Sequence, residues 1–201
     1  MSDDPPRGLL FVLSGPSGVG KDSVINRLRQ RGLPLHFAVT VTTRPKRPGE
    51  VHGVNYFFAT CEEFERMRRE GELLECAIVH GNKYGTPRAQ VREALLAGKD
   101  VLLKIDVQGA ALVRRRVPGA ISIFIAPPSV SELIERLEAR GTESAGELRT
   151  RIQDANSELA DLPNYDYVVV NYRERLDDTV DKVAAIITAE HCRVKPRVAE
   201  L

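Results

Sequence analysis

Short apolar runs that hardly alternate with polar residues recur along the chain, and between them the apolar residues follow helical spacing. Such runs are typical of parallel strands that helices cover on both faces. The predicted strands comprise residues 9–13, 36–42, 101–106, 120–125 and 167–171. Because they alternate with helical segments, the pattern predicts an α/β fold with a parallel five-stranded sheet flanked by helices.

Polar residues mark the ends of several predicted helices. Thr60 and Ser129 are each followed three positions later by Glu, which is the capping-box pattern of a helix start. Pro87 suits the first position of another helix, and Gly98 suits its end. An apolar stripe across residues 176–187 predicts a last helix, and the tail beyond it is expected to fray.

The first predicted strand leads into a glycine-rich loop and then into helical spacing. The loop and the helix start comprise Ser14, Gly15, Pro16, Ser17, Gly18, Val19, Gly20, Lys21, Asp22 and Ser23. Gly15, Gly20 and Lys21 match the G-x-x-x-x-G-K spacing of the P-loop, whose backbone N–H groups and lysine surround nucleotide phosphates. A turn that merely joins a strand to a helix would not need this spacing, so the loop predicts ATP binding.

The residue after the lysine departs from the P-loop pattern. The pattern has a Ser or Thr there, whose hydroxyl binds Mg²⁺, whereas this chain has Asp22. The nearest hydroxyl, that of Ser23, lies roughly 100° further round the helix. A carboxylate oxygen is a hard ligand, so Asp22 is a candidate for Mg²⁺ binding, directly or through a water molecule. Without a metal its charge would repel the phosphates.

Two polar segments interrupt the alternation of strands and helices. Residues 43–56 are rich in Pro, Gly and charge, and they open a stretch to about residue 85 that predicts short strands around one helix. Residues 141–146 predict a flexible joint between two helices that carry arginines. A core with two mobile excursions suits a kinase, since enclosing both substrates keeps water from accepting the phosphoryl group.

Arginines gather in both excursions. In the first, Arg44, Arg47 and Tyr56 match a clamp for phosphate, although arginines in loops are often simply solvated. In the second, Arg136 and Arg140 share a helix face, and further arginines follow beyond the joint. A bound triphosphate would offset their repulsion, but a solvated face paired with glutamates fits the spacing equally well.

Two acidic residues occupy unusual positions. Asp106 ends a predicted strand at the carboxyl edge of the sheet, where parallel sheets bind ligands. Glu75 lies inside an apolar run, where a carboxylate is usually paired or exposed at an edge. A carboxylate also accepts two hydrogen bonds, and guanine offers a pair of donors in its N1–H and 2-amino group that adenine lacks.

The composition narrows the classes of partner. With 201 residues, 28% of them charged, and a net charge of +1, the chain has no global field that favours nucleic acid or a membrane as its partner. No apolar run approaches the roughly 20 residues that span a bilayer, and the start is acidic. These features favour a cytoplasmic protein, or one in an organelle stroma or matrix if a transit peptide was removed. The three cysteines lack metal-ligand spacing and are expected to be free thiols.

From about residue 8 to residue 192, the chain resembles the guanylate kinase family. The matching segments are SGPSGVGK at 14–21, TTRPKRPGEVHGVNY at 42–56, GNKYGT at 81–86, IDVQGA at 105–110, FIAPPS at 124–129 and RLEARGTE at 136–143. The resemblance implies a P-loop NTPase fold with a core (8–38, 99–128 and 156–192), an NMP-binding subdomain (39–98) and a lid (129–155). It also implies transfer of the γ-phosphoryl group of ATP to GMP or dGMP with Mg²⁺, in purine nucleotide metabolism.

The resemblance further implies roles for individual residues by their position. Those that would hold the GMP phosphate are Arg44, Arg47, Tyr56 and Tyr84. Those that would read guanine are Thr40, Glu75, Thr86 and Asp106. Those that would act on the ATP phosphates and on the charge of the transition state are Lys21, Arg136, Arg140 and Arg151. In this scheme no residue is a covalent nucleophile, and the site supplies position and charge.

Other functions fit parts of the pattern. A non-catalytic module of similar fold keeps the GMP side to grip phosphorylated or acidic peptides, but such modules typically lose the lysine that this chain keeps as Lys21. A kinase for another monophosphate fits less well, because Glu75 and Asp106 favour guanine. Lys104 stands where many family members have an acid, and its partner, either Asp22 or a phosphate, is left open, as is the oligomeric state.

Overall fold

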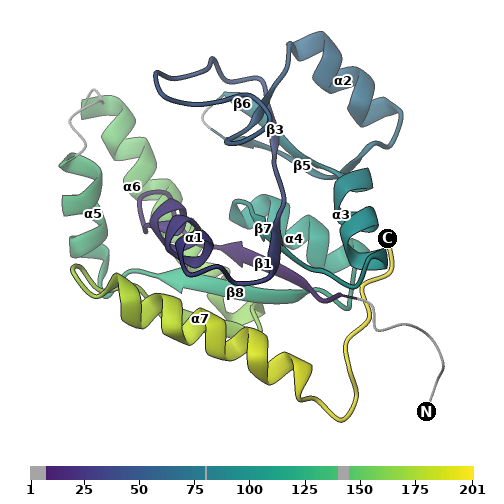
Figure 1. Ribbon diagram of the computed structural model, residues 1–201. Coiled ribbons are helices and arrows are strands. Elements are labelled where there is room, and N and C mark those ends of the chain that lie inside the picture. Colours follow the sequence, from purple (N-terminus) through teal and green to yellow (C-terminus); the bar gives the residue numbers. More distant parts are fainter. Residues whose placement is uncertain (1–7, 80, 140–144) are drawn as a thin grey trace. The chain divides into compact units, whose positions relative to one another are not determined.

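The computed structural model describes residues 8–79, 81–139 and 145–201 (Figure 1). The chain falls into two compact units. The first unit contains the described residues up to 12, residues 34–121 and residues 197–201. The second unit contains residues 13–33 and the described part of 122–196. Among the described residues, no helix is long and apolar enough to cross a membrane.

Five strands of the described chain form a parallel sheet in the order β2-β7-β1-β8-β9. They are β1 (Leu10–Ser14), β2 (Leu35–Phe37), β7 (Asp100–Lys104), β8 (Ile121–Ala126) and β9 (Tyr167–Val170). Every residue of β1 and β8 is buried, in accord with their unalternating apolar sequences. The predicted α/β fold with its five-stranded sheet is therefore confirmed.

A second sheet, in the order β4-β3-β6-β5, lies in the first unit. Its strands are β3 (Val41–Thr42), β4 (Phe57–Phe58), β5 (Leu73–Val79) and β6 (Asn82–Pro87). Strands β5 and β6 pair antiparallel, so that Glu75 lies opposite Thr86 and Ala77 lies opposite Tyr84. This register brings two predicted site residues face to face.

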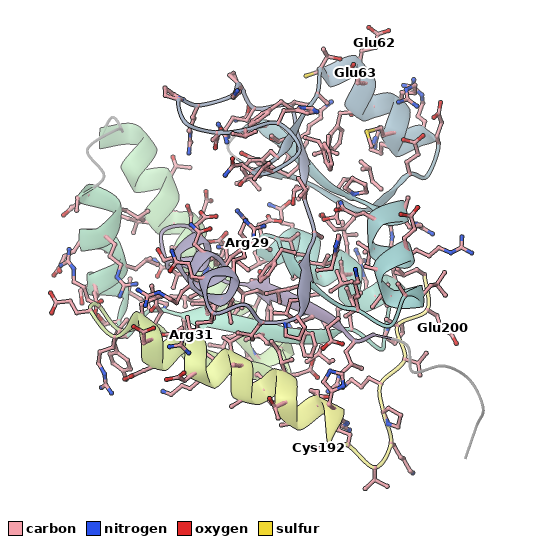
Figure 2. The ribbon with its side chains drawn as sticks, viewed as in Figure 1. Arg29, Arg31, Glu62, Glu63, Cys192 and Glu200 are labelled. Carbon is pink, nitrogen blue, oxygen red and sulfur yellow. The ribbon has the colours of Figure 1, made fainter. Side chains whose placement is uncertain are left out.

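Helix α2 (Cys61–Arg69) packs on the second sheet through Phe64, which is buried together with Val41 and Leu73 (Figure 1). The predicted capping box at its start is confirmed, because the side chains of Thr60 and Glu63 bond each other's backbone N–H groups. Figure 2 shows Glu62 and Glu63 in this first turn, where their negative charges interact favourably with the positive end of the helix dipole.

The prediction of one strand over residues 36–42 is wrong. β2 ends at Phe37, and β3 begins at Val41 in the other sheet. Between them, the side-chain amide of Gln90 bonds both backbone groups of Val39, donating to its carbonyl at 2.6 Å and accepting from its N–H at 3.0 Å. The Gln90 side chain therefore takes the place of a neighbouring strand as the hydrogen-bond partner of Val39. The apolar, β-branched sequence of this segment does not indicate such a partner.

Helices α3 (Arg88–Leu96) and α4 (Val107–Arg116) also belong to the first unit. Gly98 follows α3 with φ +73, as its predicted role at the helix end requires. Pro87 is the N-cap residue of α3 and not its first helical residue, because it still pairs with Leu73 at the end of β6. The guanidinium of Arg116 donates to the carbonyl of Leu74, which ties the end of α4 to β5.

The end of the chain is docked, so the prediction of a frayed tail is wrong for its last residues. The Arg197 guanidinium donates to the carbonyl of Ala120 at 3.5 Å. A Cβ on Gly119 would lie only 1.8 Å from the carbonyl oxygen of Val198, so the tail backbone passes directly over this glycine. The close approach between two backbones anchors the tail, and apolar patterning does not indicate it.

The second unit contains α1 (Lys21–Gln30), α5 (Val130–Glu138), α6 (Ala145–Ala160), the short 3₁₀ helix η1 (Leu162–Asn164) and α7 (Leu176–His191). Charged side chains link α1 to α7: Arg31 pairs with Asp177 at 2.7 Å and with Asp181, and Figure 2 shows Arg31 beside α7. Ser129 caps α5 by accepting from the Glu132 N–H, while the Glu132 carboxylate pairs with Arg136. Most of the predicted joint at 141–146 lies outside the described residues.

Candidate functional site

In the glycine-rich loop of the second unit, the backbone at two glycines lies so close to neighbouring atoms that a side chain would not fit. Gly15 has φ +137, and a Cβ there would lie 2.2 Å from the carbonyl oxygen of Ile125 in β8. Gly20 is the N-cap of α1 with φ +101, and a Cβ there would lie 2.5 Å from the amide nitrogen of Asn171. Glycine is therefore required at both positions for conformation and for space.

Lys21 and the loop backbone gather positive charge and N–H donors at the start of α1. The Lys21 ammonium donates to the carbonyls of Gly15 at 2.5 Å and Pro16 at 3.0 Å. The N–H of Ser17 donates to the Glu158 carboxylate of α6 at 3.2 Å. A helix N-terminus with such a loop binds anions, and the contact with Glu158 shows that at least one loop N–H donates to an anionic group.

A buried network holds the loop from behind. The Asn171 side chain donates to the carbonyl of Val19 at 2.7 Å and accepts from the Thr179 hydroxyl at 3.0 Å. Both Asn171 and Thr179 are buried. Arg136 donates to the carbonyl of Val19 at 3.2 Å and to that of Asn171 at 2.8 Å. The side chains thus fix the loop's path just before Gly20 and Lys21.

The predicted arginines of the second excursion are only partly described. Arg136 donates to the P-loop backbone, and at the same time it pairs with Glu132, as the interpretation of a helix face paired with glutamates predicts; its role toward a triphosphate stays a prediction. Arg140 lies outside the described residues, and Arg151 lies in α6 with its side chain outside them. Asp22 and Ser23 occupy the first turn of α1 and are exposed.

Three of the four predicted base-reading residues, Glu75, Thr86 and Asp106, lie together in the first unit. The Thr86 hydroxyl donates to the Glu75 carboxylate at 2.7 Å, and Asp106 caps α4 by accepting from the Gly109 N–H at 3.0 Å. A Cβ on Gly109 would lie 2.7 Å from one oxygen of Glu75 and 3.2 Å from one oxygen of Asp106. The two carboxylates therefore meet over the first turn of α4. Thr40, also buried, precedes β3 and accepts from the N–H of Phe57.

The electrostatics of Glu75 follow from this burial. Burial raises the pKa of Glu75 to about 7, the hydrogen bond from Thr86 opposes this rise, and the neighbouring charge of Asp106 adds to it. A ligand that donates hydrogen bonds to the carboxylate would offset the cost of its charge. Guanine has a suitable pair of donors.

The predicted phosphate-binding residues form a second cluster of the first unit. Arg44 donates to Glu50 at 2.6 Å, and its guanidinium lies 5.4 Å from the centre of the Tyr56 ring. The rings of Tyr56 and Tyr84 meet edge to face with their centres 6.2 Å apart. Because the Arg44 side chain is only 10% exposed, the interpretation as a simply solvated loop arginine is wrong.

Glu50 joins the two loop arginines. One oxygen of its carboxylate accepts from Arg44, and the other accepts from the backbone N–H of Arg47 at 2.8 Å. Burial raises the pKa of Glu50, but the hydrogen bonds from Arg44 and from the Arg47 backbone outweigh burial and lower it overall. The Arg47 side chain is exposed, so Arg47 shares the loop with Arg44 but not its burial.

Sequence reasoning missed Glu50, Asn171, Gln90 and Glu158 as site-building residues. Two of them had a signal. Glu50 follows Arg47 by three positions across a Pro-Gly turn, which is the spacing that closes a turn. Asn171 is the last residue of a predicted strand of the parallel sheet, as Asp106 is. The contacts of Gln90 and Glu158 are long-range and have no local pattern.

The described residues were also compared with the side-chain clusters that hold metal ions in proteins. Among the described residues, no cluster of three or more His, Cys, Asp or Glu side chains is suited to hold a metal ion. The three cysteines are free, as predicted.

The chain is similar to guanylate kinases over nearly its whole length. The family model described as guanylate kinase matches residues 7–190. A guanylate kinase of Shouchella clausii is 48% identical over 187 residues, which cover 93% of this chain and 90% of the relative. A guanylate kinase of Synechococcus sp. is 48% identical over 185 residues, covering 91% and 84%. The crystal structure of guanylate kinase from Anaplasma phagocytophilum matches with a TM-score of 0.78 and 35% identity, over 94% of this chain and 89% of that one.

Proposed function

The chain belongs to the guanylate kinase family and phosphorylates GMP to GDP at the expense of ATP, and from this premise we propose how its residues divide the reaction. The first unit binds GMP and the second unit binds ATP. We further propose a division into a core (8–38, 99–128 and 156–192), an NMP-binding subdomain (39–98) and a lid (129–155).

Glu75 and its neighbours read guanine in this proposal. The carboxylate accepts from the N1–H and the 2-amino group of the base, while Thr86, Thr40 and Asp106 complete the pocket. The buried Glu75 carboxylate, already bonded to Thr86, is the observation that carries the proposal. Adenine has no matching pair of donors, and facing it would leave the carboxylate without a partner for its second oxygen.

Arg44, Arg47, Tyr56 and Tyr84 hold the GMP phosphate. Arg44 is suited to this role because Glu50 and the ring of Tyr56 fix its guanidinium before any ligand arrives. The tyrosine hydroxyls add donors to the same cluster. With the base and the phosphate both held, GMP has one orientation, and its phosphate oxygen is the nucleophile.

The P-loop N–H groups and Lys21 hold the phosphates of ATP. In the structure the Lys21 ammonium donates to a loop carbonyl, and the Glu158 carboxylate accepts from the N–H of Ser17. A triphosphate provides better acceptors for both donors, so we infer that it displaces these contacts. Arg136, Arg140 and Arg151 stabilise the charge that develops during transfer.

The transfer itself requires no covalent intermediate on the chain. An oxygen of the GMP phosphate bonds to the γ-phosphorus of ATP as the bond from that phosphorus to the β,γ-bridging oxygen breaks, which yields GDP and ADP. The residues named above position the two phosphates in line and exclude water. dGMP keeps the same base and phosphate, so we propose it as a second acceptor.

Mg²⁺ is the metal that we propose for the reaction. Magnesium in kinases keeps several waters and takes one or two carboxylates together with the substrate phosphates, so a preformed cluster of three acidic residues is not required. Asp22 fits as the carboxylate, because it is exposed directly after Lys21 in the first turn of α1. When bound, the ion neutralises phosphate charge.

The test is ADP production from ATP with GMP, dGMP, AMP or UMP as acceptor, each titrated with Mg²⁺. We expect fast turnover with GMP and dGMP alone, and dependence on Mg²⁺. Equal turnover with AMP would contradict the role of Glu75. GMP binding without turnover at any Mg²⁺ concentration would instead indicate a non-catalytic binding module.

A further inference from the structure

We propose that Lys104 is a positioning residue of the GMP phosphate site, which directs the hydroxyl proton of Tyr56 toward the phosphate and adds a positive charge beside it. The inference rests on the proposed function, because it deepens the phosphate cluster of the first unit. It also gives Lys104 one partner, Tyr56, among the residues that we propose for binding GMP.

The geometry places Lys104 against Tyr56 in two ways. Its ammonium donates to the Tyr56 hydroxyl oxygen at 3.2 Å, and it lies 5.1 Å from the centre of the same ring. The Arg44 guanidinium lies 5.4 Å from that ring centre. One tyrosine therefore has contacts with two cations that come from separate segments of the chain, the end of β7 and the loop after β3.

The direction of the Lys104–Tyr56 hydrogen bond follows from the chemistry of the two groups. A lysine ammonium has three donors and no acceptor, so the tyrosine oxygen must accept. The hydroxyl proton of Tyr56 is then left to donate to another group. A phosphate oxygen is a suitable acceptor, because it is anionic and its hydrogen bonds with hydroxyl donors are strong.

The charges of the cluster also favour an anion. Arg44 is partly neutralised by Glu50, at 2.6 Å, whereas the phosphate of GMP carries close to two negative charges at neutral pH. Lys104 is the second cation against the Tyr56 ring, so its charge adds to that of Arg44 where a dianionic phosphate would lie.

The C-terminal end of β7 thereby contributes to binding of both the phosphate and the base of GMP. Lys104 is the last residue of this strand, and Asp106 follows two positions later as the cap of α4 beside Glu75. Parallel sheets bind ligands at the carboxyl ends of their strands. One strand end thus contributes to the phosphate cluster through Lys104 and to the base cluster through Asp106.

The experiment compares binding of GMP and of guanosine, measured by calorimetry without ATP, for the wild-type chain and three variants. In Lys104→Met we expect GMP to bind on the order of ten- to hundredfold more weakly, with guanosine binding unchanged, because guanosine has no phosphate. Lys104→Arg should restore most of the GMP affinity. Lys99→Met is the matched control, since Lys99 is exposed in the same unit and its loss removes the same charge.

A second measurement separates positioning from simple charge. In a Tyr56→Phe background, Lys104→Met should weaken GMP binding by a smaller factor than in the wild-type background, because the hydroxyl that it directs is gone. Equal factors in the two backgrounds would overturn the positioning role. The steady-state counterpart is a higher KM for GMP in Lys104→Met with the KM for ATP unchanged.

Other outcomes overturn the inference distinctly. If Lys104→Met binds GMP as the wild-type chain does, or raises only the KM for ATP, Lys104 acts elsewhere and the proposed function still stands. If guanosine binding falls by the same factor as GMP binding, the variant has disturbed the pocket and the inference fails. If the wild-type chain binds no GMP, the proposed function and the inference fail together.

Discussion

The hydroxyl of Thr86 donates a 2.7 Å hydrogen bond to the carboxylate of Glu75, and each of the two residues is only 1% exposed. The antiparallel pairing of β5 with β6 places them opposite each other. Because the carboxylate is buried and Asp106 lies near it, the pKa of Glu75 rises to about 7. The charge of the residue that we assign to guanine is therefore poised to change near neutral pH.

GMP binding should strengthen as the pH rises from 6 to 8. The carboxylate form of Glu75 accepts hydrogen bonds from both guanine donors. In the protonated form one oxygen carries an O–H that donates, so the group no longer presents two accepting oxygens to the base. At a pH below the Glu75 pKa of about 7, Glu75 is protonated in most molecules, and it must lose that proton before guanine can bind. Calorimetric titration with GMP across this range gives the profile.

Glu75→Gln is the control for this pH profile. Its amide does not titrate, so the dependence should flatten between pH 6 and 8. Since the amide has a donating NH2 group in place of one of the two accepting oxygens, one hydrogen bond to guanine is mismatched, and discrimination between GMP and AMP should also fall by roughly 1 to 3 kcal/mol. An unchanged pH profile, or unchanged discrimination, would remove Glu75 from guanine recognition.

The same pKa makes an opposite prediction for stability. The folded-state pKa of Glu75, about 7, lies above its ordinary value of 4.5, so between these pH values the folded chain binds the proton more tightly than the unfolded chain. The free energy of unfolding of the unliganded chain should therefore fall as the pH rises through this window, by on the order of 3 kcal/mol from this group. Urea unfolding at pH 5 and pH 7.5, with Glu75→Gln beside it, measures the difference.

Gly109→Ala should weaken GMP binding while leaving ATP binding intact. An Ala Cβ at this position would lie 2.7 Å from a Glu75 oxygen and 3.2 Å from an Asp106 oxygen, so the carboxylates must move apart. Alanine favours a helix interior over glycine by about 1 kcal/mol, so α4 itself gains stability. Separate titrations with GMP and with ATP check the prediction, and equal losses for both nucleotides would contradict it.

The sequence predicted the main sheet well because its buried strands are continuous apolar runs, and the P-loop because Gly15, Gly20 and Lys21 are local in the chain. Glu75 stood out as a carboxylate inside an apolar run, the resemblance supplied Thr86, and the hairpin register brings the two into contact. The resemblance could not supply the backbone contacts of Gln90 or the docked tail at Gly119, because each depends on residues distant in sequence. Charge patterning likewise did not reveal that Arg136 bonds the P-loop backbone as well as Glu132 on its own helix.

Lys21→Met should abolish most turnover and leave GMP binding largely intact. The ammonium lies on the P-loop of the second unit, whereas the proposed GMP residues lie in the first. Loss of one positive group aimed at the transferring phosphoryl typically costs about 10²- to 10³-fold in rate. Steady-state kinetics with GMP calorimetry test the prediction, and a matching loss of GMP affinity would contradict it.

Gly20→Ala should weaken ATP binding far more than Gly32→Ala does. Both glycines have positive φ, +101 and +67, so alanine strains the backbone at each position. Only at Gly20 does the new Cβ meet a neighbour, the Asn171 amide nitrogen at 2.5 Å, while nothing lies within 4 Å of the Cβ at Gly32. The pair therefore separates strain from steric displacement of the loop. Equal ATP affinities, measured by calorimetry alongside thermal unfolding, would show that the Asn171 contact does not hold the loop.

Asp22→Ser should preserve turnover and change its Mg²⁺ dependence. The substitution restores the hydroxyl that the P-loop pattern has after its lysine, and it removes a negative charge from the first turn of α1. If Asp22 is an alternative ligand, a lower or equal Mg²⁺ concentration should then support half-maximal activity. Turnover across a Mg²⁺ titration measures this, with Ser23→Ala as a control for the neighbouring hydroxyl. A collapse of activity at every Mg²⁺ concentration would contradict the prediction, and it would mean that the surrounding residues depend on the carboxylate itself.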